Sequence, residues 1–214
     1  MATFQVQVED LTGSIGDTAA ISSWLQDGCK AVVGFISKNR LEQVASNTNF
    51  TDSIDIESMK VLSVLRKDAN NSNRYMPCRE LKPSQMGRVH DSAYMEYAST
   101  SDPAYIIHNQ VINTFPESSA SNDSRVVSIN TDITVLHGAT NIDNFPDEVE
   151  YAVTLYAARQ AIERKVSDAN VDEDIEMAAS YSNQYAIVDA QYKEALQLLG
   201  VEEIDERKLQ KDAR

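Results

Sequence analysis

The densest group of side chains that could do chemistry in this chain is acidic. Residues 171–176 read VDEDIE and bring four carboxylates close together, those of Asp172, Glu173, Asp174 and Glu176. Oxygen ligands of this kind suit Mg²⁺ and Ca²⁺, although the segment lacks the alternating spacing and central glycine of a calcium loop. At the start of a helix the same carboxylates interact favourably with the helix dipole. We favour this interpretation over that of a small acidic enzyme that uses Mg²⁺.

The cysteines and histidines form no evident site. Cys29 and Cys78 have no neighbouring Cys or His at metal-ligand spacing, which fits two reduced thiols and leaves a disulfide between them open. His90, His108 and His137 are scattered, and nothing in the sequence pairs one of them with a cysteine nucleophile. The sequence also contains no Gly-rich phosphate loop, G-x-S-x-G elbow or His-Glu-x-x-His pair. We therefore expect no catalytic residues, no cofactor and no bound metal.

Charge and hydropathy limit the functions that this chain can have. Its 214 residues include 33 Asp and Glu against 19 Lys and Arg, a formal net charge of −14. Because affinity for nucleic acids comes mainly from Lys and Arg, we expect no tight DNA binding. The first ten residues, MATFQVQVED, lack the basic and apolar regions of a signal peptide. The longest apolar run, residues 31–36, is much shorter than the roughly 20 residues of a membrane span, so we expect a soluble protein without membrane contact.

The first clear element is a helix over residues 18–38. Asp17 can cap its start, and apolar residues then recur at spacings of three and four up to position 36. Gly28 and Gly34 weaken a helix interior by roughly 1 kcal/mol each relative to Ala. We expect one of them to pack closely against a neighbouring helix, the alternative being a loosely packed helix.

A change of period marks a β-rich middle. Residues 39–57 are polar and read as a connecting loop, after which short, branched, apolar segments predict two hairpins, 60–67 with 74–80 and 104–107 with 111–115. The second hairpin turns at Asn109, a residue type that tolerates the left-handed conformation of a tight turn. Residues 125–136 predict one further strand, or two.

Two helices follow the β-rich middle. Residues 149–166 are apolar around much of the helix, which predicts a central helix packed on several sides. Pro146 and the acidic Asp147, Glu148 and Glu150 mark its start. In the next helix, apolar residues alternate at spacings of three and four and end before Gly200, a typical residue just past a helix end: Ala178, Tyr181, Tyr185, Val188, Tyr192, Ala195 and Leu199.

This second apolar pattern has two interpretations. Tyr181, Tyr185, Val188 and Tyr192 are either core residues or an inter-subunit contact, because tyrosine suits both places. The charged tail, residues 201–214, forms one more short helix or stays mobile.

Together these elements predict an α+β fold. An antiparallel helical bundle, formed by the N- and C-terminal helices, carries an inserted small β-rich domain. We expect an N-terminal helix and loop at 1–57, the β-rich insertion at 58–137, the C-terminal helices at 138–200 and the tail at 201–214.

The order of segments resembles a family. Residues 145–151 (FPDEVEY) and 156–160 (YAARQ), followed by a long helix with an acidic start, resemble the C-terminal half of head-to-tail adaptor (connector) proteins of tailed bacteriophages, including the tail tubular protein A type. Residues 95–105 (MEYASTSDPAY), leading into a hairpin that closes with Phe115-Pro116, are similar to a segment of virion structural proteins of such phages. The resemblance covers residues 18–199 in order of elements and ends at the tail.

The resemblance implies a non-catalytic structural role. It implies a homo-oligomeric ring of about twelve copies in the neck of the virion, assembled in the host cytoplasm. The ring would dock below the portal protein and hold a tail nozzle or stopper protein. Double-stranded DNA would pass through its channel without specific binding, since an acidic lumen repels phosphates only weakly beyond a Debye length of roughly 10 Å. The alternative is another neck or tail assembly component: a stopper, tail-completion or tail-terminator protein.

The tail would then dock to the portal. In related adaptors the C-terminal segment reaches the portal, and by position this segment includes Val201, Glu202, Ile204, Arg207, Leu209 and Arg214 here.

Overall fold

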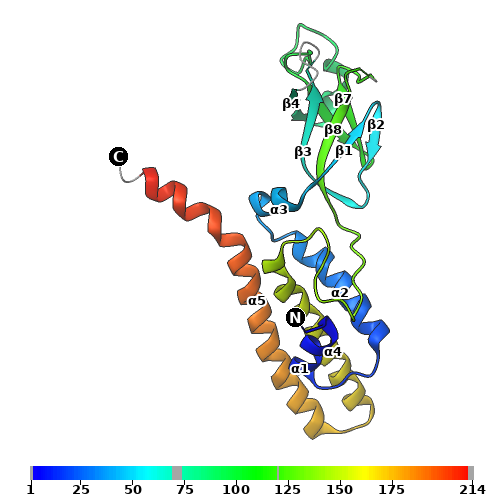
Figure 1. The fold of residues 1–214 in the computed structure, drawn as a ribbon, viewed down its shortest axis with the longest axis vertical. Helices are drawn as coiled ribbons and strands as arrows, with labels where there is room; N and C mark the ends of the chain where they lie inside the picture. Colours follow the sequence, from blue (N-terminus) through cyan, green and yellow to red (C-terminus); the bar gives the residue numbers. More distant parts are fainter. Residues whose placement is uncertain (1, 69–73, 120, 212–214) are drawn as a thin grey trace. The chain divides into compact units, whose positions relative to one another are not determined.

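The computed structural model describes residues 2–68, 74–119 and 121–211, with side chains up to Leu199. The chain divides into a helical unit, Met1–Gln43 with Thr131–Arg214, and a β unit, Val44–Asn130 (Figure 1). N- and C-terminal helices thus flank a β-rich region, which confirms the predicted α+β class.

The helical unit is built around α4. Its helices are α1 (Phe4–Thr12), α2 (Thr18–Val33), α4 (Asp147–Val171) and α5 (Ile175–Lys211), and α3 (Lys38–Val44) leads to the β unit. Helix α4 contacts α1, α2 and α5, and its buried residues lie all around it, from Val149 to Ala169. The central position predicted for this helix is therefore confirmed.

Local signals fix the helix ends. Asp17 accepts a hydrogen bond from the Ala20 amide at 3.0 Å, as expected of the cap of α2. Pro146 precedes α4, whose first turn holds the three predicted acidic residues. The carbonyls that end α1 are satisfied by other helices: Lys165 Nζ donates to the Thr12 oxygen and Gln184 Nε2 to the Leu11 oxygen, both at 2.6 Å. The start of the chain is therefore held by α4 and α5.

Gly28 lies where α2 approaches α4. A Cβ at this position would lie 3.1 Å from Tyr156 Cδ1 and 3.3 Å from Val153 Cγ1. At Gly34, which ends α2, a Cβ would meet only the Ala31 oxygen, at 3.7 Å. The predicted close approach of a neighbouring helix is confirmed, and it is at Gly28.

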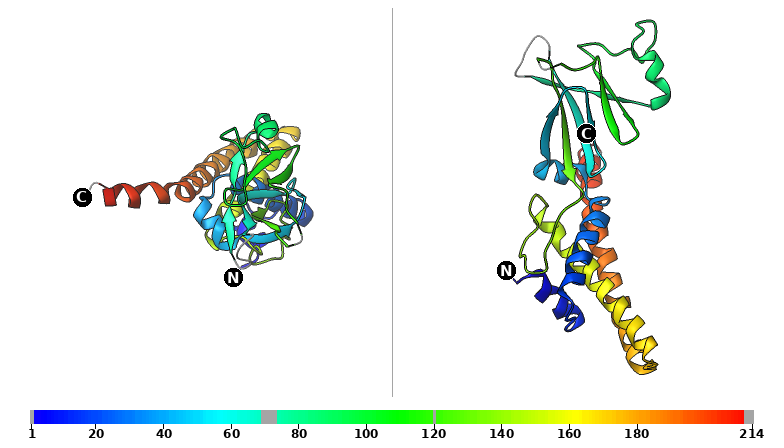
Figure 2. Two further views of the ribbon diagram at one scale, coloured as in Figure 1. Left: turned by 90° about the horizontal axis from the view of Figure 1, so that it is seen from above. Right: turned by 90° about the vertical axis from the view of Figure 1, so that its right-hand side faces the viewer.

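The β unit consists of two four-stranded sheets (Figure 2). One has the order β1 (Ser46–Phe50), β8 (Ser124–Asn130), β3 (Met59–Lys67), β4 (Tyr75–Pro77), and all its pairs are antiparallel. The other has the order β2 (Ser53–Asp55), β7 (Val111–Phe115), β6 (Ala104–His108), β5 (Arg79–Leu81), with β5 and β6 parallel. A 3-10 helix, η1 (Pro83–Arg88), follows β5.

Both predicted hairpins form. Strands β3 and β4 pair across a connection of which residues 69–73 lie outside the described part. Strands β6 and β7 pair in the register Ile107↔Ile112, and Asn109 and Gln110 have φ angles of 53° and 60° in the turn between them. The left-handed conformation expected at Asn109 is therefore present.

The structure differs from the sequence prediction at several element ends. Residues 39–57 contain α3, β1 and β2 rather than only a loop, so the β unit begins at Val44 and not at about residue 58. Its last strand ends at Asn130, and residues 131–137 belong to the helical unit. Strand β1 is polar because it pairs with β8 at the edge of its sheet, and such a strand has no apolar alternation to reveal it.

The helices differ as well. Helix α2 ends at Val33 rather than at residue 38, and α1 was not predicted at all. Helix α5 does not end before Gly200 but continues to Lys211. A glycine inside a helix costs only about 1 kcal/mol, which a long helix can tolerate.

Candidate functional site

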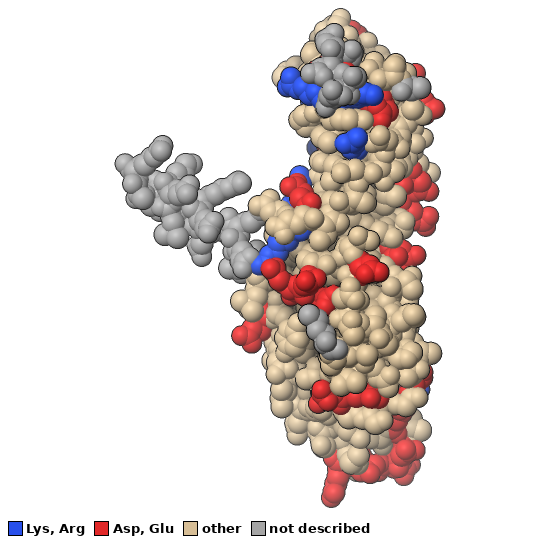
Figure 3. Space-filling model, in the orientation of Figure 1, with Lys and Arg blue, Asp and Glu red and all other residues tan. Residues whose placement is uncertain are grey.

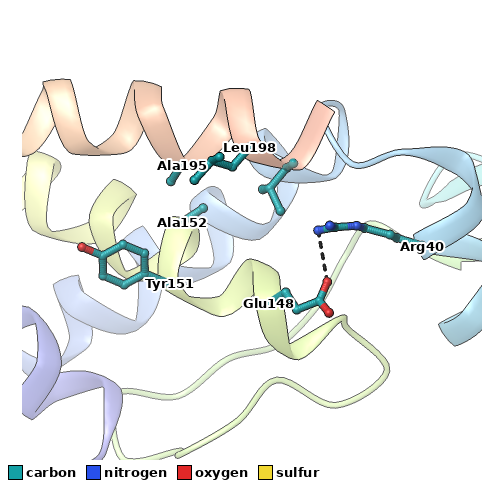
Figure 4. A pocket seen from close by; sticks show the side chains of 7 residues that line it. Arg40, Glu148, Tyr151, Ala152, Ala195 and Leu198 are labelled. Carbon is teal, nitrogen blue, oxygen red and sulfur yellow. Dashed lines mark ion pairs between the residues drawn. The ribbon is translucent and has the colours of Figure 1, made fainter. Parts of the chain in front are cut away.

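A groove runs between α4 and α5 in the helical unit (Figure 4). Its volume is about 380 Å³, and seven residues of α3, α4 and α5 line it: Arg40, Glu148, Tyr151, Ala152, Ala195, Leu198 and Leu199. We call it the α4/α5 groove. It exists because alanines face each other there, Ala152 on α4 and Ala195 on α5, where larger side chains would fill the space between the helices.

Large apolar side chains are exposed at this groove. Tyr151 is 55% and Leu198 65% exposed, whereas Leu199 beside it is buried. At one end Arg40 forms an ion pair with Glu148, with 3.1 Å between Nη1 and Oε2 (Figure 4). An apolar hollow with exposed aromatic and aliphatic side chains and a charged rim is typical of a protein–protein contact.

The predicted tyrosine pattern lies mostly inside the helical unit. Val188 and Tyr192 are 3% and 6% exposed, and the Tyr192 ring meets Tyr156 of α4 edge-on, with 5.9 Å between centroids. Tyr181 and Tyr185 are half-buried, and the Lys165 ammonium lies 5.8 Å from the Tyr181 ring centroid. Val188 and Tyr192 are therefore core residues in this chain, and the exposed contact surface of α5 lies elsewhere.

Arg159 links the same two helices by charge. Its Nη1 donates to Asp189 Oδ1 at 3.1 Å, and Lys193 Nζ lies 2.6 Å from Asp189 Oδ2. Hydrogen bonding to Lys193, together with both positive charges, lowers the pKa of Asp189. These contacts hold α5 against α4 on the outside of the tyrosine core.

The acidic cluster forms the turn between α4 and α5. Asp172 ends α4, Glu173 has a φ of 58°, and Asp174 Oδ1 accepts a hydrogen bond from the Met177 amide at 3.0 Å. Asp174 is thus a helix cap, as the dipole interpretation expects. Within the ranges that the structure describes, no three His, Cys, Asp or Glu residues come together as a metal site would need.

Neither cysteine is set up as a nucleophile. Cys29 is fully buried in α2 and Cys78 is half-buried in the β unit, and both are free thiols. Burial raises the pKa of each thiol to about 12, so the reactive thiolate is disfavoured at neutral pH. His137 Nδ1 lies 3.2 Å from Ser22 Oγ, where it ties the 131–146 segment to α2.

The tail residues predicted to dock to a portal have no described side chains. Val201, Glu202, Ile204, Arg207 and Leu209 belong to the last turns of α5, and Arg214 lies beyond the described backbone. Their side-chain contacts therefore lie outside the described residues.

The acidic charge of the chain is concentrated in the helical unit. This unit has 23 Asp and Glu against 11 Lys and Arg, a net charge of −12, whereas the β unit has 10 against 8, a net charge of −2. Acidic side chains occur over much of the visible face of the helical unit (Figure 3).

Comparisons with known proteins add no relative. No protein-family model matches the chain, and no curated protein matches its sequence significantly. Among the described helices, none has the length and apolar composition needed to cross a membrane.

Sequence reasoning missed the α4/α5 groove. Tyr151 and Leu198 are far apart in the sequence, and each stands outside the apolar pattern of its own helix. The available signal was that each is a large apolar residue on a helix face that the pattern assigns to solvent.

Proposed function

We propose that this chain is a non-catalytic virion structural protein, the subunit of a head-to-tail adaptor ring in a tailed bacteriophage. The ring would dock below the portal and hold a tail nozzle or stopper protein in the neck of the virion. Double-stranded DNA would pass through its channel without specific binding. The order of segments that resembles the adaptor family is the basis of this proposal.

The α4/α5 groove is the observation that supports it best. A subunit that works only inside an assembly must expose apolar surface before it assembles, and Tyr151 and Leu198 are such surface. The side chains most suited to catalysis have structural roles instead. Asp174 caps a helix and the two thiols are held protonated by burial.

Charge also fits the proposed channel. A helical unit at −12 repels the phosphate backbone instead of binding it, so a duplex could slide past. An acidic lumen needs no specific DNA contact.

The experiment is to mix the purified chain with the products of the neighbouring genes in its own genome. Negative-stain electron microscopy and native mass spectrometry would then follow assembly. We expect a ring seated on a portal, with a mass that gives the number of subunits. The chain alone and each neighbouring protein alone are the controls.

Other outcomes would change the assignment. A ring or plug bound to the tail proteins but not to the portal would favour a stopper, tail-completion or tail-terminator protein. A monomer that binds none of the neighbouring products would contradict the assembly role.

A further inference from the structure

A loop of the β unit exposes an unusual amount of apolar surface. Residues 83–97, here the Met–Tyr loop, begin with η1 and expose two methionines and two tyrosines. Met95 is 96% exposed, Met86 49%, Tyr94 47% and Tyr97 39%. Met, Tyr and Arg are enriched at protein interfaces, and such a concentration in one short loop is a feature of a contact surface.

The Met–Tyr loop is held in one conformation. Val89 and Ala98 are buried in a core with Leu81 and Phe115, and the Ala98 amide donates to the Val89 oxygen at 3.0 Å. Arg79 holds the loop's end by donating to the Tyr97 carbonyl and to Asp102 Oδ2. Because the loop is already ordered, docking would cost it little conformational entropy.

The loop also has a fixed apex. The Arg88 guanidinium lies over the Tyr94 ring, 5.3 Å from its centroid, and pairs with Glu96 at 3.6 Å. These contacts set the backbone on both sides of Met95. The Met95 side chain itself stands almost wholly in solvent.

We infer that the Met–Tyr loop of one molecule docks, with Met95 foremost, into the α4/α5 groove of a second molecule. The inference rests on the proposed assembly function and names the surfaces that would join two subunits. The loop is an apolar projection and the groove an apolar hollow, so each molecule carries both halves of the contact. A flexible, unbranched methionine side chain adapts well to an irregular hollow floored by alanines.

Charge complementarity argues that the partner is a second copy. The helical unit that holds the groove has a net charge of −12, and the β unit that holds the loop has one of −2. Two helical units repel each other more strongly than a β unit and a helical unit do. The exposed cations Lys82 and Arg88 adjoin the loop, and Glu148, 70% exposed, stands at the groove.

The two surfaces are different, so the contact is heterologous. Contacts of this type leave one free loop and one free groove on every pair, and a third molecule can add to each. Closed rings are built from such contacts.

Disulfide trapping between two differently tagged variants tests the contact. One variant is Met95→Cys and the other Leu198→Cys, mixed under mild oxidation. We expect a cross-link that joins the two tags. The matched control replaces Leu198→Cys by Ile187→Cys, since Ile187 is 61% exposed on the same helix but does not line the groove. Equal cross-linking with both partners would overturn the inference.

Sedimentation velocity of Met95→Asp provides the second measurement. An unpaired charge at an apolar contact should raise the dissociation constant of self-association about ten-fold or more. Leu136→Asp, at another exposed apolar residue, should leave it unchanged. Full self-association of Met95→Asp would overturn the loop contact while leaving the assembly role intact. A wild-type chain that neither cross-links nor self-associates at high concentration would overturn the inference, and the neck experiment would still test the assembly role separately.

Discussion

Gly28 sets the distance between α2 and α4. With no side chain at this position, the two helices approach until Tyr156 and Val153 stand where a Cβ contact would begin. Val153 is fully buried, and the Tyr156 ring is held edge-on by Tyr192, so neither neighbour has room to yield. Close packing of this kind converts the absence of a methyl group into buried contact area.

The Gly28→Ala variant tests this. The alanine gains about 1 kcal/mol of helix propensity but loses about 1–3 kcal/mol to overpacking, so we expect a lower melting temperature. Gly34→Ala is the control, because its Cβ meets only one atom at 3.7 Å and its φ of −63° suits alanine. Thermal melting should separate the pair, with Gly34→Ala equal to or above the wild type. A stabilised Gly28→Ala would contradict the packing argument.

Val188 and Ile187 are adjacent residues in opposite environments. Val188 is 3% exposed against α4 and Ile187 is 61% exposed. We expect Val188→Asp to cost about 3 kcal/mol or more, because it buries an unpaired charge. Ile187→Asp should change the free energy of unfolding by less than about 0.5 kcal/mol. Chemical denaturation measures both, and similar losses would show that α5 is not oriented as described.

At the scale of elements, the pairing of α4 with α5 is the main contact of the helical unit. Apolar burial supplies its centre, and Asp189 joins Arg159 of α4 to Lys193 of α5 at its edge. The lowered pKa of Asp189 means that the folded state favours the ionised carboxylate. This contribution to stability is present above the unfolded pKa and is lost as pH falls through the folded value.

Acid therefore should weaken the helix pair. We expect the melting temperature of the wild type to fall below about pH 4, where unfolded aspartate begins to take up protons. Asp189→Asn should melt lower than the wild type at pH 7 and lose less of its melting temperature between pH 5 and pH 3. Parallel slopes for the two proteins would show that Asp189 does not contribute to the acid response.

Element prediction from the sequence succeeded where the apolar period is long. Helices α2, α4 and α5 and both hairpins followed from spacing and turn residues. Helix α1 did not, because Phe4, Val6 and Val8 alternate with polar residues and mimic a strand. Its caps and its packing under α4 override that pattern. The α4/α5 groove is a tertiary feature made by two distant segments, and local periodicity carries no record of it.

At the scale of the whole molecule, the tail and the two units have separable roles. Leu199 is the last residue with a described side chain, and it is buried in the helical unit. The residues after it are mostly charged, so the proposed role of residues 201–214 is docking to the portal rather than folding.

Truncation after Gly200 tests this division. We expect the melting temperature to change by less than about 4 °C, which corresponds to about 1 kcal/mol for a protein of this size. Binding to the portal, measured by co-sedimentation, should be lost. Failure of the truncated chain to fold would contradict the assignment of the tail.

The helical unit is discontinuous, and this has a consequence for synthesis on the ribosome. The β unit, Val44–Asn130, is complete before the first residue of α4 has been translated. The Thr12 and Leu11 carbonyls of α1 meet their donors only after Lys165 and Gln184 have emerged. The nascent chain must therefore carry a finished β unit and an unpartnered α1 and α2 at the same time. Apolar residues of the early helices, Phe4 and Ile21 among them, are then accessible to chaperones for as long as it takes to translate the second half of the chain.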